Sequence, residues 1–164
     1  MKVCEFKHDR DFVLKAVRVE ADVFEYVEFK DDKEVVMEAV RNGYNLYFAS
    51  ERLKNDEEVV MKAVKNNASS LQIASKELQW NEDFVLNVVA ENPMCLGHVL
   101  FENGGFFLKA IKKNKACLDY ALRICKKYSK WLLGMGSRIF KDSMTQYSNT
   151  NKFLETEILF FDQN

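Results

Sequence analysis

The chain has 164 residues, of which 48% are hydrophobic and 13% aromatic, and it contains six glycines and one proline. This much apolar sequence can supply a core and excludes a generally disordered chain, while so few turn-forming residues argue against a sheet-rich fold. The formal net charge of −1 combines an acidic and a basic part of the chain. Residues 1–100 contain 13 Lys/Arg and 19 Asp/Glu, whereas residues 101–164 contain 11 Lys/Arg and 6 Asp/Glu.

Five copies of one motif follow one another along the chain, and each copy opens with a helical pattern. Their starts are 23, 24, 25 and 22 residues apart, a period typical of stacked repeats. Each opens with Asp or Asn, a good helix N-cap, and continues almost entirely apolar, so we expect each helix to be covered by its neighbours. The five segments are DRDFVLKAV (Asp9–Val17), DKEVVMEAV (Asp32–Val40), DEEVVMKAV (Asp56–Val64), NEDFVLNVV (Asn81–Val89) and NGGFFLKAI (Asn103–Ile111).

A shorter helix is expected after each long one, because apolar residues recur there at helical spacing. These second segments are Phe24–Val27, Leu46–Ser50, Leu71–Ser75, Leu96–Val99 and Leu118–Ala121. Between the two helices stand residues that tolerate the left-handed conformation in which many helices end, namely Gly43, Asn67, Asn92 and Asn114. Asn92 has a second interpretation, because it precedes Pro93 and can instead cap the following helix.

The pattern predicts an all-α fold, an α-solenoid of about five two-helix repeats of 22–25 residues. We place the array at residues 1–133 and a non-repeat C-terminal extension at residues 134–164. The stretch DKEVVMEAVRNGYNLYFASERLKNDEEVVMKAVKNNASSLQIASKEL (Asp32–Leu78) resembles the DUF4116 repeat family, whose members show D-x-E-V-V-L-x-A-V followed by L-x-Y-A-S-E-E-L. The resemblance implies a helical-repeat fold, and it transfers no activity and no functional residues, since the family has none assigned.

The remaining segments predict a basic helix at Arg123–Leu133, a polar loop at residues 142–151 and an apolar cap at Phe153–Phe161. The N-terminus carries charges every few positions and does not resemble a secretory signal. No stretch approaches the roughly 20 apolar residues of a membrane span. The four cysteines include no CxxC pair, which favours reduced thiols and a cytoplasmic or otherwise intracellular protein.

One possible metal site begins with Cys95 and His98, which share a helix face at a spacing of three. With Cys117 and Cys125 they would offer four zinc ligands. The alternative, favoured by the irregular spacing, makes both Cys95 and Cys117 packing residues in equivalent turns and His98 a replacement for an aromatic core residue. No nucleotide-binding glycine loop is present, and the carboxylates fall at helix starts, where stability explains them. We therefore expect no cofactor and no enzymatic activity.

Basic residues concentrate between Lys109 and Lys130, interleaved with Tyr120 and Tyr128 and with Asp119 as the one acid. Such a segment can bind nucleic-acid phosphates and stack bases, or attract an acidic protein or an anionic membrane, or form a solvated helix face. The candidate partner-binding residues are Lys109, Lys112, Lys113, Lys115, Arg123, Lys126, Lys127 and Lys130.

The expected function is a non-enzymatic scaffold that binds another protein along the surface of the repeats. The alternative is a nucleic-acid-binding module acting through Lys109–Lys130, which the isoelectric point of about 6.2 disfavours. Head-to-tail association of the acidic and basic ends is a third hypothesis, weakened by screening beyond about 8 Å at physiological salt.

Overall fold

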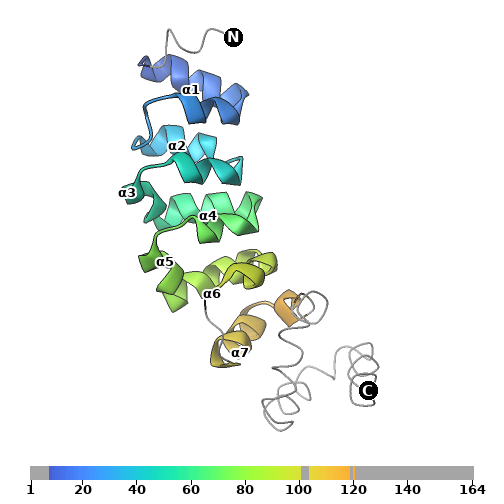
Figure 1. The fold of residues 1–164 in the computed structure, drawn as a ribbon. Coiled ribbons are helices and arrows are strands. Elements are labelled where there is room, and N and C mark those ends of the chain that lie inside the picture. Colours follow the sequence, from blue (N-terminus) through green and yellow to red (C-terminus); the bar gives the residue numbers. More distant parts are fainter. Residues whose placement is uncertain (1–7, 101–103, 119, 121–164) are drawn as a thin grey trace. The chain divides into compact units, whose positions relative to one another are not determined.

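The fold is helical in the computed structural model, which describes residues 8–100, 104–118 and 120 (Figure 1). Each copy begins with what we call its first helix: α1 (Arg10–Val19), α2 (Lys33–Ala39), α4 (Glu57–Asn66), α6 (Glu82–Glu91) and α7 (Gly104–Lys113). A 3₁₀ second helix follows in four of them: η2 (Ala21–Tyr26), η3 (Gly43–Phe48), η4 (Ala68–Gln72) and η5 (Pro93–His98). Two short helices, α3 (Glu51–Lys54) and α5 (Lys76–Trp80), follow η3 and η4, residues 116–118 and 120 are also helical, and the described part of the chain includes no strand.

The expected N-caps are confirmed in the four copies whose caps are described. Asp9 accepts a hydrogen bond from the backbone N–H of Phe12, and Asn81 accepts one from Phe84. Asp32 and Asp56 each accept two, from the second and third N–H groups of their helices. These bonds satisfy N–H groups that have no partner inside the helix. Asn103, the expected fifth cap, lies outside the described residues.

The first helices pack against one another in chain order, α1 on α2, α2 on α4, α4 on α6 and α6 on α7. Figure 1 shows α1, α2, α4 and α6 side by side. Ala39, Ala63 and Ala110 occupy the same position in three of these helices and are fully buried. The second helices contact their counterparts as well, from η2 to η5, so each copy is covered by its neighbours in the way the apolar pattern predicts.

The second helices are 3₁₀ rather than α-helices, and the residues between the two helices do not take the expected left-handed conformation. Asn67 and Asn92 are extended, with φ of −148° and −135°. The backbone N–H of each asparagine donates to the carbonyl of Ala63 or Val88 and so ends the first helix. The side-chain oxygen of the same asparagine accepts from the backbone N–H two residues later and so starts the second helix. A left-handed residue would break this double role, so the second interpretation of Asn92 and Pro93 is confirmed.

Gly43 is the first residue of η3, and it is buried against the third copy. A Cβ atom at this position would lie 2.6 Å from Asn67 Cβ and Ser70 Oγ and 2.8 Å from the carbonyl oxygen of Ala63. Ser70 Oγ also donates a hydrogen bond to the Gly43 carbonyl at 3.0 Å. Glycine is therefore required here by the close approach of two copies, and not by a helix end.

The described helices all lie in one compact unit that ends at Ala121. The boundary expected at residue 133 and the three segments expected after the repeats, Arg123–Leu133, residues 142–151 and Phe153–Phe161, lie outside the described residues. None of the described helices combines the length and the apolar character that a membrane crossing needs.

We predict that Gly43→Ala lowers the free energy of unfolding by about 1–3 kcal/mol, because the added methyl group forces two packed copies apart. Urea denaturation with circular dichroism measures the change. Gly97→Ala is the matched control: it also lies in a 3₁₀ helix, but its nearest contact would be the Tyr120 hydroxyl at 3.2 Å, the end of a side chain that can turn aside. The prediction is wrong if both variants unfold alike.

Candidate partner-binding surface

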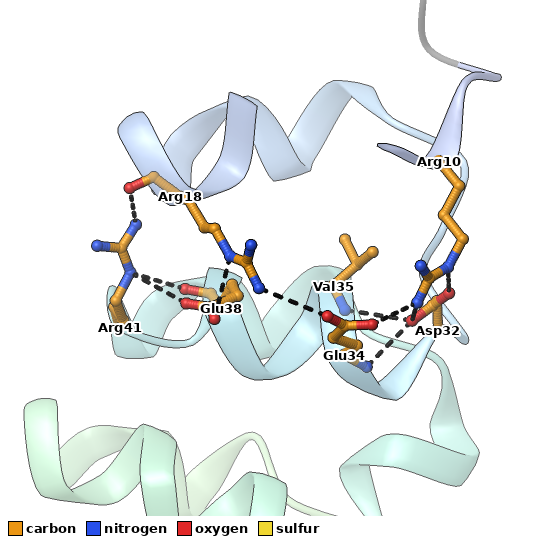
Figure 2. A network of polar contacts seen from close by, with 7 residues as sticks. All are labelled: Arg10, Arg18, Asp32, Glu34, Val35, Glu38 and Arg41. Carbon is orange, nitrogen blue, oxygen red and sulfur yellow. Dashed lines mark hydrogen bonds and ion pairs between the residues drawn. The ribbon is translucent and has the colours of Figure 1, made fainter. Parts of the chain in front are cut away.

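Ion pairs join the starts of adjacent first helices. Arg10 of α1 donates through Nε and Nη2 to the capping carboxylate of Asp32, at 2.5 and 3.2 Å, and through Nη2 to Glu34 at 2.8 Å (Figure 2). The hydrogen bond from Arg10 is the largest of the effects that hold the pKa of Asp32 below its usual value. Asp32 thus caps α2 and binds the preceding copy with the same carboxylate.

An ion pair between a basic residue of one first helix and the cap of the next also joins the second and third copies, but the later copies are joined differently. Lys33 Nζ lies 2.8 Å from Asp56 and 2.8 Å from Glu58. The third copy carries Glu57 at the equivalent position, and the next cap is the neutral Asn81. Between α6 and α7 the charges are reversed, because Lys109 Nζ of the later helix pairs with Glu82 at 2.6 Å.

The ends of the first helices are joined to the following copy by side-chain donors. Arg41 Nη2 donates to the carbonyls of Val17 and Arg18, at 2.8 and 2.6 Å (the latter contact is drawn in Figure 2). Later copies use amides in the same way, since Asn66 donates to Val40, Asn92 to Val64 and Asn114 to Ala90, at 3.3, 2.9 and 2.7 Å. Carbonyls left without a partner at a helix C-terminus are satisfied by the next copy.

The basic segment predicted from the sequence is partly engaged in these contacts. Lys109 is paired with Glu82, and Lys113 Nζ lies 2.6 Å from the amide oxygen of Asn87. Lys112 and Lys115 are exposed. The other candidates, Arg123, Lys126, Lys127 and Lys130, lie outside the described residues. Lys109 and Lys113 thus have partners inside the array.

The proposed metal ligands are placed as packing residues where they are described. Cys95 and Cys117 are fully buried, and the Cys117 thiol donates to the carbonyl of Val89 at 3.7 Å. Burial raises the pKa of Cys95 to about 12 and that of Cys117 to about 11, which opposes the thiolate form that zinc requires. His98 is half-buried. In the described part of the chain no three potential ligands gather, and Cys125 lies outside it.

A group of exposed tyrosines on the second helices was not predicted. Tyr26, at the end of η2, and Tyr44 and Tyr47, on η3, have exposed fractions of 67%, 65% and 67%. In a 3₁₀ helix residues three apart lie directly above one another, so Tyr44 and Tyr47 share one face. Apolar residues at helical spacing predict a helix in this segment, but that spacing alone does not show which of its aromatic residues are exposed.

Lys30 lies between η2 and η3 beside these tyrosines. Its Nζ donates to the carbonyls of Phe24 and Glu25 and lies 4.1 and 5.2 Å from the ring centres of Phe24 and Phe48. Burial lowers the pKa of Lys30 to about 8. The ammonium group donates to carbonyls at the C-terminal end of η2 and links the second helices of the first two copies.

The DUF4116 family model, a domain of unknown function, matches residues 32–79 and residues 56–102. Together the two matches cover residues 32–102. Both matches begin at a capping aspartate, Asp32 or Asp56, and each spans two successive copies, so the resemblance predicted from the sequence is confirmed. No curated protein and no solved structure matches the chain. The DUF4116 region includes Tyr44 and Tyr47 but neither η2 nor α7.

We predict that the stabilising effect of the Asp32 carboxylate depends on pH. Its pKa is lowered in the folded chain, so its contribution is complete above the unfolded value near 3.8 and is lost as the pH falls through the lower, folded value. Asp32→Asn keeps the cap and removes the charge. The difference in free energy of unfolding between wild type and variant should be largest near neutral pH and shrink below about pH 4.

Asp9→Asn is the matched control for this measurement. Asp9 holds the same position in α1 but has no cationic partner among the described residues. Chemical denaturation at a series of pH values compares the two substitutions. If the difference in free energy of unfolding between the wild type and Asp32→Asn stayed constant with pH, this result would contradict the role of the ion pair.

The thiols of Cys95 and Cys117 should be unreactive in the folded protein, since both are buried and hold their protons. Iodoacetamide at about pH 8 followed by peptide mass spectrometry should find them unmodified in the native protein and modified after unfolding. Rapid native modification of either thiol, or stoichiometric zinc in the purified protein, would show that they are not simply packing residues.

Proposed function

We propose that the chain is a non-enzymatic helical-repeat module, an α-solenoid that binds another protein through the exposed face of its second helices. The observation that carries the proposal is the exposure of Tyr26, Tyr44 and Tyr47, each about two-thirds exposed in a layer of packed helices. Tyrosine is enriched at the centres of protein interfaces, because its ring supplies contact area and its hydroxyl a hydrogen bond.

The two surfaces of the array differ in how their polar groups are used. On the first helices, charged side chains pair across copies, as in Arg10 with Asp32 and Lys33 with Asp56. A partner that bound there would have to displace these pairs. On the second helices, Tyr44 and Tyr47 project from one face of η3 at little cost in side-chain entropy on binding, since a tyrosine side chain has few rotatable bonds.

The absence of an enzymatic role is part of the proposal and is supported by what the carboxylates do. Asp9, Asp32 and Asp56 cap helices, and Glu34, Glu58 and Glu82 pair with cations of adjacent copies. Groups engaged in this way contribute to stability rather than to acid–base catalysis.

The test compares partner capture by the wild type and by two surface variants. We expect Tyr26→Ala/Tyr44→Ala/Tyr47→Ala to lose a protein that the wild type retains from the native cell. The control Lys15→Ala/Lys62→Ala removes exposed or half-buried side chains of first helices and should retain it. The captured protein is then purified, and its direct binding is measured by calorimetry, where we expect a loss of roughly tenfold or more for the tyrosine variant.

Nucleic-acid binding is the competing outcome. Duplex and single-stranded probes are titrated at two salt concentrations against the wild type and Lys112→Glu/Lys115→Glu. Tight binding that falls steeply with salt and is lost in the lysine variant, with no protein retained through the tyrosines, would contradict the proposal.

A further inference from the structure

The second helices present equivalent pairs of side chains on their outer face. Phe24 of η2 and Leu46 of η3 are equivalent, fully buried positions, which places Asp22 at the position of Tyr44 and Glu25 at the position of Tyr47. Both acidic residues are exposed. Because 3₁₀ helices have about three residues per turn, each pair lies on one face of its helix.

The two pairs lie on adjacent helices. η2 packs against η3, and the amide of Asn42, which caps η3, donates to the carboxylate of Asp22 at 2.6 Å. The start of one pair is therefore joined directly to the cap of the helix that bears the other. We call the surface made by Asp22, Glu25, Tyr44 and Tyr47 the acidic tyrosine face.

Among the four described 3₁₀ helices, η2 to η5, charged residues are restricted to the first copy. Residues 20–28 hold four acids and no Lys or Arg, whereas residues 42–50, 67–75 and 92–99 hold no Asp, Glu, Lys or Arg. Glu28 has a partner, since His8 Nδ1 lies 2.7 Å from its carboxylate, and Glu25 attracts the ammonium group of Lys30, which donates to backbone carbonyls. Asp22 accepts from the uncharged amide of Asn42, and the side chains of Asp22 and Glu25 are exposed.

Tyr47 already has a cation near its ring in the folded chain. Lys54 Nζ lies 5.7 Å from the ring centre while pairing with Glu51 at 2.9 Å. A cation held jointly by a tyrosine ring and a carboxylate is therefore a contact that this layer forms. The acidic tyrosine face offers the same two components, carboxylates on η2 and rings on η3, to a cation from outside.

We infer that the acidic tyrosine face binds an arginine-rich peptide segment of the partner. This inference rests on the proposed function and names the class of partner. Guanidinium groups pair with carboxylates through a planar fork and stack on tyrosine rings, so arginine uses both halves of the face. Packed helices lie about 8–10 Å apart and an extended chain advances about 3.3–3.6 Å per residue, so about every third residue of the peptide faces a new copy.

The test uses fluorescein-labelled nona-arginine and anisotropy with the full chain, in EDTA, at about 50 mM and about 150 mM salt. We expect saturable binding, with nona-lysine weaker and nona-glutamate absent. Tyr44→Ser/Tyr47→Ser leaves the charge unchanged and should weaken nona-arginine roughly fivefold or more through the loss of two rings. Glu25→Lys should weaken it about threefold to tenfold.

Ser69→Ala/Gln72→Ala is the matched control, since these residues occupy the same two positions on η4. It should bind as the wild type does, and circular dichroism confirms that each variant is folded. Equal binding of nona-arginine by the tyrosine variant and the wild type would overturn the inference, because only unspecific attraction would remain.

The inference and the proposed function can fail separately. If nona-arginine does not bind but the tyrosine variant still loses a purified protein partner, the inference is wrong and the proposed function stands. If no protein depends on the tyrosines in the capture experiment and nona-arginine does not bind, both are wrong.

Discussion

The C-terminal carbonyl groups of α1, α2, α4 and α6 are satisfied by the copy that follows each of them. The last turn of a helix leaves four carbonyls without partners, and in this chain Arg41, Asn66, Asn92 and Asn114 each reach back to donate to one or two of them. At the other end of the helices Arg10 and Lys33 join the caps of the copies that follow. A single copy would lose all of these contacts together with the cover of its apolar sides, so the stability of the array lies in the interfaces between copies.

The interfaces differ from one another, and the differences follow the sequence. Where the second position of a copy is Arg or Lys and the next cap is Asp, an ion pair forms. The third copy has Glu57 and is followed by Asn81, which removes both partners at once. Between the fourth and fifth copies Lys109 reaches back to Glu82 instead. The basic character of the fifth copy therefore contributes to the joining of copies, a role that a count of charges does not distinguish from partner binding.

In the proposed function the second helices carry the surface that binds the partner. Their interior residues are held by packing and by Lys30, whose ammonium group contacts two carbonyls and two rings. Their outer positions vary freely from copy to copy, from Asp22 and Glu25 to Tyr44 and Tyr47 to Ser69 and Gln72. A repeat scaffold whose inner positions are constrained and whose outer positions vary can bind a partner through the outer ones.

The sequence by itself determined the helical class, the five copies, the capping residues of the first helices and the resemblance to the DUF4116 family that the family match confirms. The caps depend on neighbours within a few residues, the copies on a regular repeat length, and the helical class and the family resemblance on the pattern of residue types. A sequence displays all of these. It did not determine the role of Gly43 or Asn67, because their conformation follows from how tightly the next copy approaches.

The 3₁₀ form of the second helices, and with it the exposure of Tyr44 and Tyr47, was likewise decided by the tertiary structure. A change from 3.6 to about three residues per turn moves a side chain from the inner to the outer face, and only packing against neighbouring copies selects between the two.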